Sequence, residues 1–242
     1  MKPVISIIIP TLREEEYLDK TLKNFNTLKI PHEIIITDGG SKDRTLEIAK
    51  KYTNKISVWG KERRQTFGEA KNAGAALATG DFFVFIDADV IVPDPEQFFE
   101  EIILVFHKNR NLVATTVPLR PFPDTKYWAD RMFSEPLNWW YIVSNNYFGS
   151  GNASGEFQMI RADDFRRVSG YHEHLAAGED NNMFYRLAKI GNTLCYSKLH
   201  VFHSYRRIRK LGWLKVYHDW LLNGFSVMFL RRAAFKEWEV VR

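Results

Sequence analysis

The sequence predicts an α/β fold built on a mainly parallel sheet with helices on both faces. The first ninety residues alternate between short apolar runs, rich in β-branched and aromatic side chains, and segments with helical spacing. Polar residues directly follow several of the apolar runs. Strands that alternate with helices form parallel sheets, whose ligands bind beyond the carboxyl ends of the strands. A ligand site is therefore expected at that edge.

Four runs have the features of buried strands: residues 4–9, 33–37, 55–59 and 82–86. Three segments between them are expected to be helices: residues 14–28, 41–51 and 68–79. Two glycines after the second run permit a tight turn, and Ser41 or Asp43 could cap the helix that follows. Four polar residues at the ends of these strands share one edge of the expected sheet: Thr11, Asp38, Asp87 and Asp89.

Length and composition are those of a globular protein. At 242 residues with 45% hydrophobic content, the chain can form one large domain or two small ones. Cys195 is the only cysteine, so no disulfide can form within the chain. The first thirty residues have no signal-peptide features, and no window is apolar enough to span a membrane. We therefore expect a cytoplasmic protein, with peripheral attachment to a membrane left open.

The net charge of +5 is unevenly distributed along the chain. From Tyr205 to the C-terminus, nine Lys or Arg residues stand against three Asp or Glu residues, an excess of six positive charges. A basic segment of this kind suits an anionic partner such as phosphate, acidic lipid or nucleic acid.

Two carboxylates end the fourth apolar run, because Asp87 and Asp89 follow residues 82–86 with one alanine between them. This spacing allows both to share a divalent cation, and Mg²⁺ or Mn²⁺ commonly bridges carboxylates and substrate phosphates. A pair that only ends a strand and caps the next helix would look the same, since aspartate is common in turns. The segment PTLREEEYL after the first run contains no glycine, which excludes both glycine-rich nucleotide-binding loops.

Four blocks occur in an order and spacing typical of one family: SIIIPTLREEEYL, EIIITDGGSKDRT, EAKNAGAALATGDFFVFIDADV and GEDNNMFYRLAKIG. Together they resemble the inverting glycosyltransferases of family 2, which have the Rossmann-like GT-A fold. The resemblance implies a GT-A domain over residues 1–204. Its nucleotide-binding half would cover about 1–110 and its acceptor half about 111–204, followed by a basic, aromatic helical extension at 205–242.

The resemblance also implies which residues bind a nucleotide-sugar donor. Thr11 and Glu14 match positions that contact the base and ribose, and Asp38 matches the acid that holds the nucleobase or ribose. Asp38 could instead be an ordinary turn residue. Four basic residues are candidates for cationic contacts to the nucleotide or its diphosphate, with a solvated surface position as the alternative for each: Arg64, Lys71, Arg206 and Arg207.

A metal site is implied by the same resemblance. Asp87 and Asp89 match the D-x-D element, in which the second acid usually binds the metal and the first reaches the ribose or a metal-bound water. His203 lies where many relatives have a histidine that completes this site, although a lone histidine is often structural. His200 is three residues earlier and would face differently. The expected cofactor is Mn²⁺ or Mg²⁺.

The acceptor half is expected to supply the general base. Asp180 matches the family's base, and Glu179 would orient the acceptor or Asp180 itself, although acids at a helix start are ordinarily capping residues. Small residues around Gly149–Gly155, including Gly151 and Asn152, suit a backbone that approaches the acceptor closely. An ordinary glycine-rich loop would have the same composition.

The expected function is metal-dependent, inverting transfer of one sugar from a nucleoside-diphosphate donor, with UDP favoured. The acceptor would be a hydroxyl or phosphate of a glycan or lipid-linked molecule, and no nucleic-acid partner is expected. Processive synthases carry a Gln-x-x-Arg-Trp-like element that this sequence lacks. Two other classes are alternatives: a sugar nucleotidyltransferase, which would show a glycine-rich loop after the first strand, and a non-catalytic nucleotide-sugar or lipid binding protein on the same fold.

The C-terminal extension is expected to be an amphipathic helix. Its aromatic and apolar residues recur at spacings of one, three or four: Trp213, Tyr217, Trp220, Leu221, Phe225, Met228 and Phe229. Such a stripe between basic clusters suits the interface of an anionic bilayer. It could also pack onto its own domain or onto a second copy in a homodimer.

Overall fold

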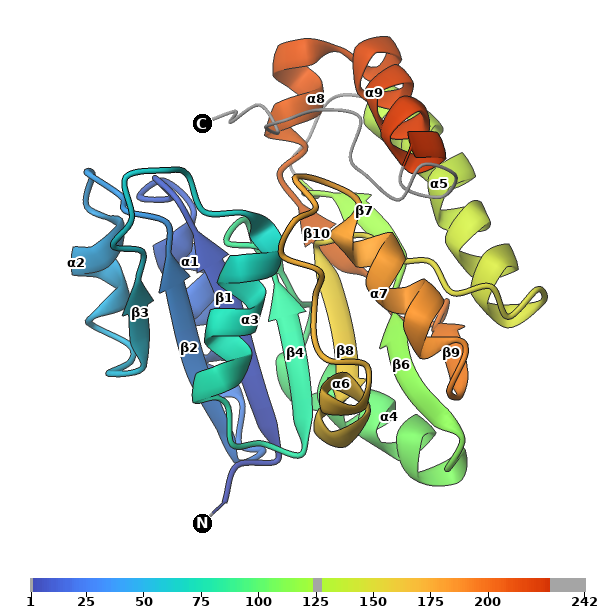
Figure 1. Cartoon of the computed structure of the whole chain (residues 1–242), viewed down its shortest axis with the longest axis horizontal. Coiled ribbons are helices and arrows are strands. Elements are labelled where there is room, and N and C mark those ends of the chain that lie inside the picture. The colour runs from blue at the N-terminus through green and yellow to red at the C-terminus, as the bar shows by residue number, and fades with distance from the viewer. Residues whose placement is uncertain (1, 124–127, 227–242) are drawn as a thin grey trace.

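The computed structural model describes residues 2–123 and 128–226. Its large sheet contains β1 (Ile5–Thr11), β2 (His32–Asp38), β3 (Ile56–Val58), β4 (Phe82–Ile86), β6 (Leu112–Thr116), β8 (Phe157–Arg161) and β9 (Asn192–Cys195). The strand order is β3-β2-β1-β4-β8-β6-β9 (Figure 1). β1 pairs in parallel with β2 and β4, β2 with β3, and β6 with β9. β8 is antiparallel to β4 and β6. The prediction of a mainly parallel sheet is confirmed.

A smaller sheet adjoins the carboxyl ends of these strands. It consists of β5 (Val90–Ile91), β7 (Leu119–Pro121) and β10 (Val201–His203), with β10 at its centre. β10 runs antiparallel to β5, and His203 pairs with Val90. Val90 comes directly after Asp89, so this pairing brings a histidine from late in the chain to the acids that follow β4.

The helices are α1 (Leu18–Asn24), the 3₁₀ helix η1 (Phe25–Thr27), α2 (Thr45–Ala49), α3 (Phe67–Leu77), α4 (Pro95–Lys108), α5 (Trp128–Asn146), α6 (Ala162–Arg167), α7 (Glu179–Leu187), α8 (Arg206–Leu211) and α9 (Trp213–Phe225). Side chains of α1 and α4 pack against one face of the sheet, and those of α6 and α7 against the other, which α3 also covers (Figure 1). Because neighbouring strand residues point to opposite faces, Ile7 and Ile8 of β1 belong to these two separate cores.

Two predicted helices are shorter in the structure. The segment expected to be helical from Glu14 begins at Leu18, because the backbone N–H of Glu14 donates to Thr45 Oγ1 in a turn before α1. α2 begins at Thr45, after Asp43 Oδ1 has accepted the Thr45 N–H. Ser41 does not cap this helix, because its hydroxyl donates to Asp38. α3 agrees closely with its prediction and begins with a capping box formed by Thr66 and Glu69.

The described part of the extension, residues 205–226, contains two helices where one was predicted. Gly212, with φ +82°, separates α8 from α9, a conformation that disfavours a continuous helix. Trp213 and Val216 are buried against Tyr205 and Ile208, so the first part of the apolar stripe packs onto the chain itself.

The structure describes only part of the remaining apolar stripe of the extension. Tyr217 and Trp220 lie half-buried beside the same cluster. Leu221 and Phe225 belong to α9, whereas Met228 and Phe229 lie outside the described residues. The division into domains at residue 204 stays a prediction. Over residues 2–123 and 128–226, no helix combines the length and hydropathy needed to cross a membrane.

Candidate active site

The expected polar edge is present at the carboxyl ends of β1, β2 and β4. Thr11 Oγ1 donates to Asp38 Oδ1 over 3.1 Å, and both residues are buried. The Asp38 carboxylate also accepts the Ser41 hydroxyl at 2.6 Å and the N–H groups of Gly40 and Ser41 at 2.9 and 2.7 Å. Asp38 therefore holds its own turn in place. Its contact with a nucleoside stays a prediction, as does that of Thr11.

Glu14 and Arg206, both predicted to contact the nucleotide, pair with each other. Two guanidinium nitrogens of Arg206 lie 2.7 Å from the two carboxylate oxygens of Glu14, which is a bidentate ion pair. Arg206 Nε also lies 3.3 Å from Asp89 Oδ2. The pair joins the start of the C-terminal extension to the loop after β1, at the edge of the sheet where the candidate donor residues lie.

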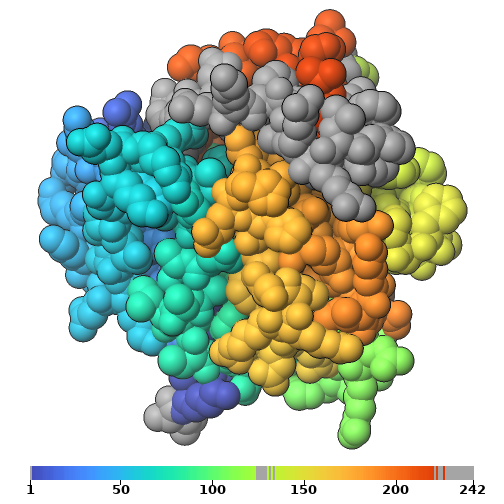
Figure 2. All heavy atoms as spheres, viewed as in Figure 1, coloured from blue at the N-terminus to red at the C-terminus, as the bar shows by residue number. Residues whose placement is uncertain are grey.

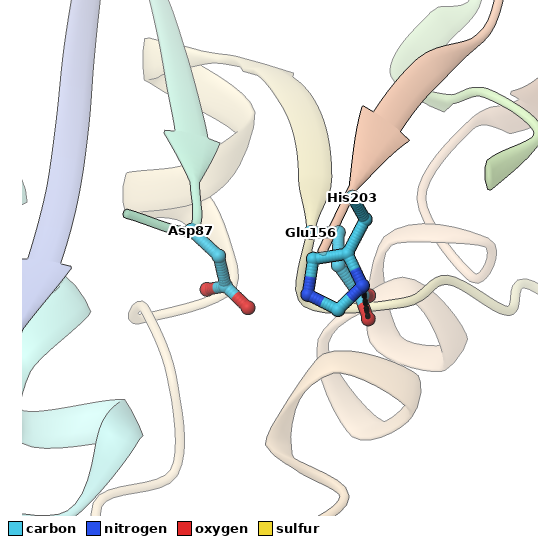
Figure 3. Close-up of side chains that lie close together, drawn as sticks. All are labelled: Asp87, Glu156 and His203. Carbon is cyan, nitrogen blue, oxygen red and sulfur yellow. Dashed lines mark ion pairs between the residues drawn. The ribbon is translucent and has the colours of Figure 1, made fainter. Parts of the chain in front are cut away.

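A candidate metal centre is formed by Asp87, Glu156 and His203 (Figure 3). One ligand atom from each lies within 4.8 Å of the others, and the Asp87 carboxylate points toward the other two side chains. Asp87 follows β4 and Glu156 precedes β8, and the antiparallel pairing of Ile86 with Phe157 places them side by side. Glu156 was not predicted from the sequence.

Asp89 contacts residues 203–206, and its direct contact with the metal stays a prediction. Its buried carboxylate lies 3.3 Å from Nε2 of His203, accepts the Ser204 hydroxyl and pairs with Arg206. It is not part of the three-residue group. Nδ1 of His203 instead lies 3.9 Å from Glu156 Oε1. A carboxylate that accepts one imidazole N–H fixes the ring and its tautomer, so Asp89 orients His203.

Burial and neighbouring charges strongly perturb the acids and the histidine of this centre. Burial, with the nearby Glu156, raises the pKa of Asp87 to about 7. Burial alone would lower the pKa of His203, but Asp89 and then Glu156 outweigh it and raise that pKa to about 9. Burial also opposes ionisation of Asp89, yet His203 and Arg206 hold its pKa well below its usual range. The centre therefore favours positive charge at its middle.

The two candidates for the general base, Glu179 and Asp180, lie in the first turn of α7. Lys71 Nζ lies 3.1 Å from Glu179 Oε1 and 2.5 Å from Asp180 Oδ1. Gly178 is the N-cap residue of α7, and no side chain caps it, so the two acids bind the lysine in place of a capping role. Burial, with the adjacent Asp180, raises the pKa of Glu179 to about 8. Lys71 is thus paired with the two acids at the start of α7, and its nucleotide contact stays a prediction.

The raised pKa values predict how stability depends on pH. In the folded state, the pKa values of Asp87, Glu179 and His203 lie above their ordinary values of 3.8, 4.5 and 6.5. Each group therefore binds its proton more tightly in the folded chain than in the unfolded chain. Their contributions to the free energy of unfolding are present at low pH and disappear as the pH rises through about 7, 8 and 9, respectively. The unfolding free energy without metal should fall by about 1 kcal/mol or more between pH 6 and 9.

Urea denaturation with EDTA at successive pH values measures this dependence. Asp89 and Glu33 have lowered pKa values and titrate only in acid, so they do not oppose the trend. His203→Gln should flatten the curve, whereas a stability that is constant or rises from pH 6 to 9 would show that these groups are not protonated as the structure indicates.

The predicted acceptor loop is held by its own contacts. Gly151 has φ +71°, and a Cβ atom there would lie 2.2 Å from the carbonyl oxygen of Phe184 in α7. The carbonyl of Asn152 accepts from Asn145 Nδ2 at 2.6 Å. Glycine is therefore required at position 151 for close packing, and the acceptor contacts of Gly151 and Asn152 stay predictions.

Arg64 and Arg207 complete the predicted set. Arg64 lies in the loop before α3, and Arg207 in the first turn of α8, and both are half-buried. Their proposed contacts with the nucleotide stay predictions. His200, which was expected to face away from the metal, packs its ring against Phe202 at 5.0 Å between centroids.

Comparison with known proteins identifies the family. A family model described as "Glycosyl transferase family 2" matches residues 6–169. The chain belongs to this family. The matched region contains three of the four blocks that carry the resemblance in sequence, together with Asp87, Asp89 and Glu156.

Several curated proteins are similar to this family 2 chain. The O-antigen chain rhamnosyltransferase WbaN of Salmonella anatum is 28% identical over 215 residues, which are 84% of this chain and 67% of the relative. The succinoglycan biosynthesis protein ExoA of Rhizobium meliloti is 26% identical, with 76% of this chain and 58% of the relative matched.

A shorter match is closer in sequence. The dolichyl N-acetyl-alpha-D-glucosaminyl phosphate 3-beta-D-2,3-diacetamido-2,3-dideoxy-beta-D-glucuronosyltransferase of Methanococcus voltae is 40% identical over 103 residues, 39% of this chain and 31% of the relative. The chain thus spans between 31% and 67% of the length of these three curated relatives.

Solved structures share the fold. The mannosyltransferase PcManGT from Pyrobaculum calidifontis, in complex with GDP-Man and Mn²⁺, superimposes with a TM-score of 0.73 at 16% identity, over 95% of this chain and 65% of that one. Residues 1–349 of S. aureus TarS, in complex with UDP-GlcNAc, give a TM-score of 0.62 at 16% identity, over 95% and 73% of the two chains. The predicted GT-A fold is confirmed.

Proposed function

We propose that this family 2 chain is a metal-dependent, inverting glycosyltransferase. It moves one sugar from a nucleoside-diphosphate donor to a hydroxyl or phosphate of a glycan or lipid-linked acceptor. One observation carries the proposal: the metal-ligand group and the general-base candidate meet at the start of β8. Glu156 belongs to the first, and Gln158, two residues later, donates to Asp180 Oδ1 at 2.6 Å.

The residues of the candidate metal centre fit a divalent cation. Two buried or half-buried carboxylates and one imidazole suit Mn²⁺, and Mg²⁺ prefers oxygen ligands alone. Burial, and then the nearby Glu156, raise the pKa of Asp87, so a bound cation would favour its ionised form. Asp87, Glu156 and His203 would hold the ion, with Asp89 orienting His203. When bound, the cation supplies Lewis-acid stabilisation to the leaving diphosphate.

Donor binding is assigned to the edge formed by the ends of β1, β2 and β4. Thr11, Glu14 and Asp38 line this edge, and Arg206 presents a guanidinium there that matches phosphate geometry. The similar structures contain GDP-Man in one case and UDP-GlcNAc in another. We favour a UDP-linked donor for this chain, with a GDP-linked donor as the alternative to be tested.

Asp180 takes the proton of the acceptor. Its carboxylate is largely buried but still accessible, with 16% of the side chain exposed. As the acceptor oxygen attacks the anomeric carbon opposite the leaving diphosphate, Asp180 removes the proton and the configuration inverts. A lipid-linked acceptor is consistent with the dolichyl-linked substrate in the name of the M. voltae relative.

A donor panel distinguishes the three candidate functions. Purified protein is incubated with UDP- and GDP-sugars and Mn²⁺, and the released nucleotide is measured with and without added acceptors. A transferase releases nucleoside diphosphate, whereas a non-catalytic binding protein gains thermal stability from donors without releasing product. A sugar nucleotidyltransferase would instead form nucleotide sugar from a nucleoside triphosphate and a sugar phosphate.

Peripheral attachment at the cytoplasmic face of a membrane is a further part of the proposal. Trp213 is buried within the protein and cannot contact lipid. We assign the lipid contact to exposed apolar side chains: Trp139, Tyr147, Phe148 and Leu214. The basic start of the extension would add attraction to anionic lipid. Size-exclusion chromatography with light scattering tests the alternative of a homodimer.

Co-sedimentation with vesicles tests the membrane contact. The protein should sediment with phosphatidylglycerol-containing vesicles and not with phosphatidylcholine vesicles, and high salt or Leu214→Ser with Phe148→Ser should weaken binding. Val58→Ser, at an exposed apolar residue of β3, is the matched control. Equal recovery in the supernatant with both vesicles would exclude peripheral attachment through these residues.

A further inference from the structure

Within the described part of the chain, hydrogen bonds hold the Asp180 carboxylate through its Oδ1. Oδ1 accepts from Lys71 Nζ at 2.5 Å and from Gln158 Nε2 at 2.6 Å. Among the described residues, no hydrogen bond to Oδ2 is found. Two donors on one oxygen fix the rotation of the carboxylate, so the position of Oδ2 is fixed as well.

Lys71 is itself held firmly. It is 1% exposed, binds Glu179 Oε1 as well as Asp180, and lies 5.1 Å from the centre of the Tyr171 ring. Its helix α3 is fastened to the segment before α7, because the Asn72 side chain exchanges two hydrogen bonds with the backbone of Tyr171 at 2.8 and 2.9 Å. Figure 2 shows this later segment (gold) lying against the N-terminal half (teal).

The orientation of Gln158 is also determined. Its Oε1 accepts from the Tyr171 hydroxyl at 2.5 Å, and its Nε2 donates to the Ser154 carbonyl at 2.8 Å as well as to Asp180. Since every polar atom of this buried amide has a partner, a flipped amide would break all three bonds. Gln158 therefore presents a donor to Asp180 at all times.

The other oxygen faces a glycine. A Cβ atom built on Gly155 would lie 2.8 Å from Asp180 Oδ2, closer than a real side chain permits. Because Gly155 has no side chain, Oδ2 can lie this close to the backbone beside Glu156 of the candidate metal centre. With 16% of the Asp180 side chain exposed and Oδ1 held by two donors, Oδ2 is the oxygen left for an acceptor hydroxyl.

We propose that Lys71 and Gln158 are positioning residues that hold Oδ1 of Asp180, so that Oδ2, which lies beside Gly155, takes the acceptor proton. This assignment rests on the proposed function and replaces the nucleotide contact expected for Lys71. The Lys71 ammonium group also offsets the charge of two adjacent acids, Glu179 and Asp180. Removal of either donor frees the carboxylate to rotate, and small misplacements of a reacting group can lower turnover by up to about 10²-fold.

The experiment compares Lys71→Met, Gln158→Leu and Gly155→Ala with a control, Lys55→Met, which removes a lysine paired with Glu33 at the far end of β2. Turnover is measured with UDP-GlcNAc and GDP-mannose in Mn²⁺, and UDP and GDP binding by calorimetry. The three variants should lose about 10- to 100-fold in kcat with nucleotide Kd changed less than threefold. In an Asp180→Asn background, Lys71→Met and Gln158→Leu should lower turnover no further.

Stability supplies a readout that needs no donor. Lys71→Met should lower Tm less in the Asp180→Asn background than in the wild type, because its partner is already altered. Loss of nucleotide binding, full additivity with Asp180→Asn in turnover, or equal Tm shifts in both backgrounds would overturn the assignment. If Lys71→Met does not fold, Gln158→Leu and Gly155→Ala carry the test. Unchanged turnover in Asp180→Asn itself would instead contradict the proposed base.

Discussion

Asp180→Asn should lower turnover by about two to four orders of magnitude and leave nucleoside diphosphate affinity unchanged. The amide keeps the shape of the carboxylate but cannot accept the acceptor proton. Because the base acts on the acceptor, donor binding does not depend on it. Steady-state kinetics with the donor found in the panel, together with calorimetry of the free nucleotide, give the two quantities separately.

Asp163→Asn is the matched control for this variant, since Asp163 is an exposed acid in the first turn of α6. It should leave both quantities unchanged. If Asp180→Asn retained near-wild-type turnover, Glu179 would be the first candidate for the base, because it shares Lys71 with Asp180.

Removal of either acid of the candidate metal centre should abolish metal-dependent nucleotide binding. Asp87→Asn and Glu156→Gln each take away one of the three candidate ligands, which leaves the diphosphate charge uncompensated in a partly buried site. Calorimetry of UDP and GDP with Mn²⁺ or EDTA measures the effect. Glu101→Gln on α4, which removes the charge of a carboxylate that accepts from the Tyr196 hydroxyl, is the control and should bind like the wild type.

Asp89→Asn separates the two possible sets of ligands. If Asp89 orients His203, its loss should weaken metal affinity by about 10- to 100-fold without abolishing it. If the D-x-D prediction from sequence holds in full, Asp89→Asn should abolish binding and Glu156→Gln should have little effect. The comparison of these two variants therefore decides whether Asp89 or Glu156 is the direct ligand.

The parallel part of the fold was predictable because its strands are buried on both faces. Such strands produce continuous apolar runs, like residues 82–86, that a reader of the sequence can recognise. The end of each apolar run also marks the carboxyl end of a strand. The position of Asp38 and Asp87 at one edge of the sheet was therefore predictable as well. β5, β7 and β10 have two or three residues each, too few to show a period.

The roles of Glu156, Lys71 and Arg206 depend on contacts between distant parts of the chain. Glu156 reaches Asp87 only through the antiparallel pairing of β8 with β4, and β8 gave no signal in the sequence. Lys71 meets its partners 108 and 109 residues later, and Arg206 meets Glu14 at a separation of 192. Residue spacing within one helix or strand carries no information on such pairs, so only the three-dimensional structure could assign them.

Metal-dependent release of nucleoside diphosphate is the most direct test of the proposed chemistry. UDP- and GDP-sugars are incubated with wild-type protein and with Asp180→Asn, in Mn²⁺ or EDTA, with glycan and lipid-linked acceptors present, and the free diphosphate is quantified. If the protein transfers sugar, the wild type should release nucleoside diphosphate in Mn²⁺ but not in EDTA. Asp180→Asn should reduce this release at least about 100-fold. Donor binding without release under every condition, or equal release in EDTA, would contradict a metal-dependent transferase.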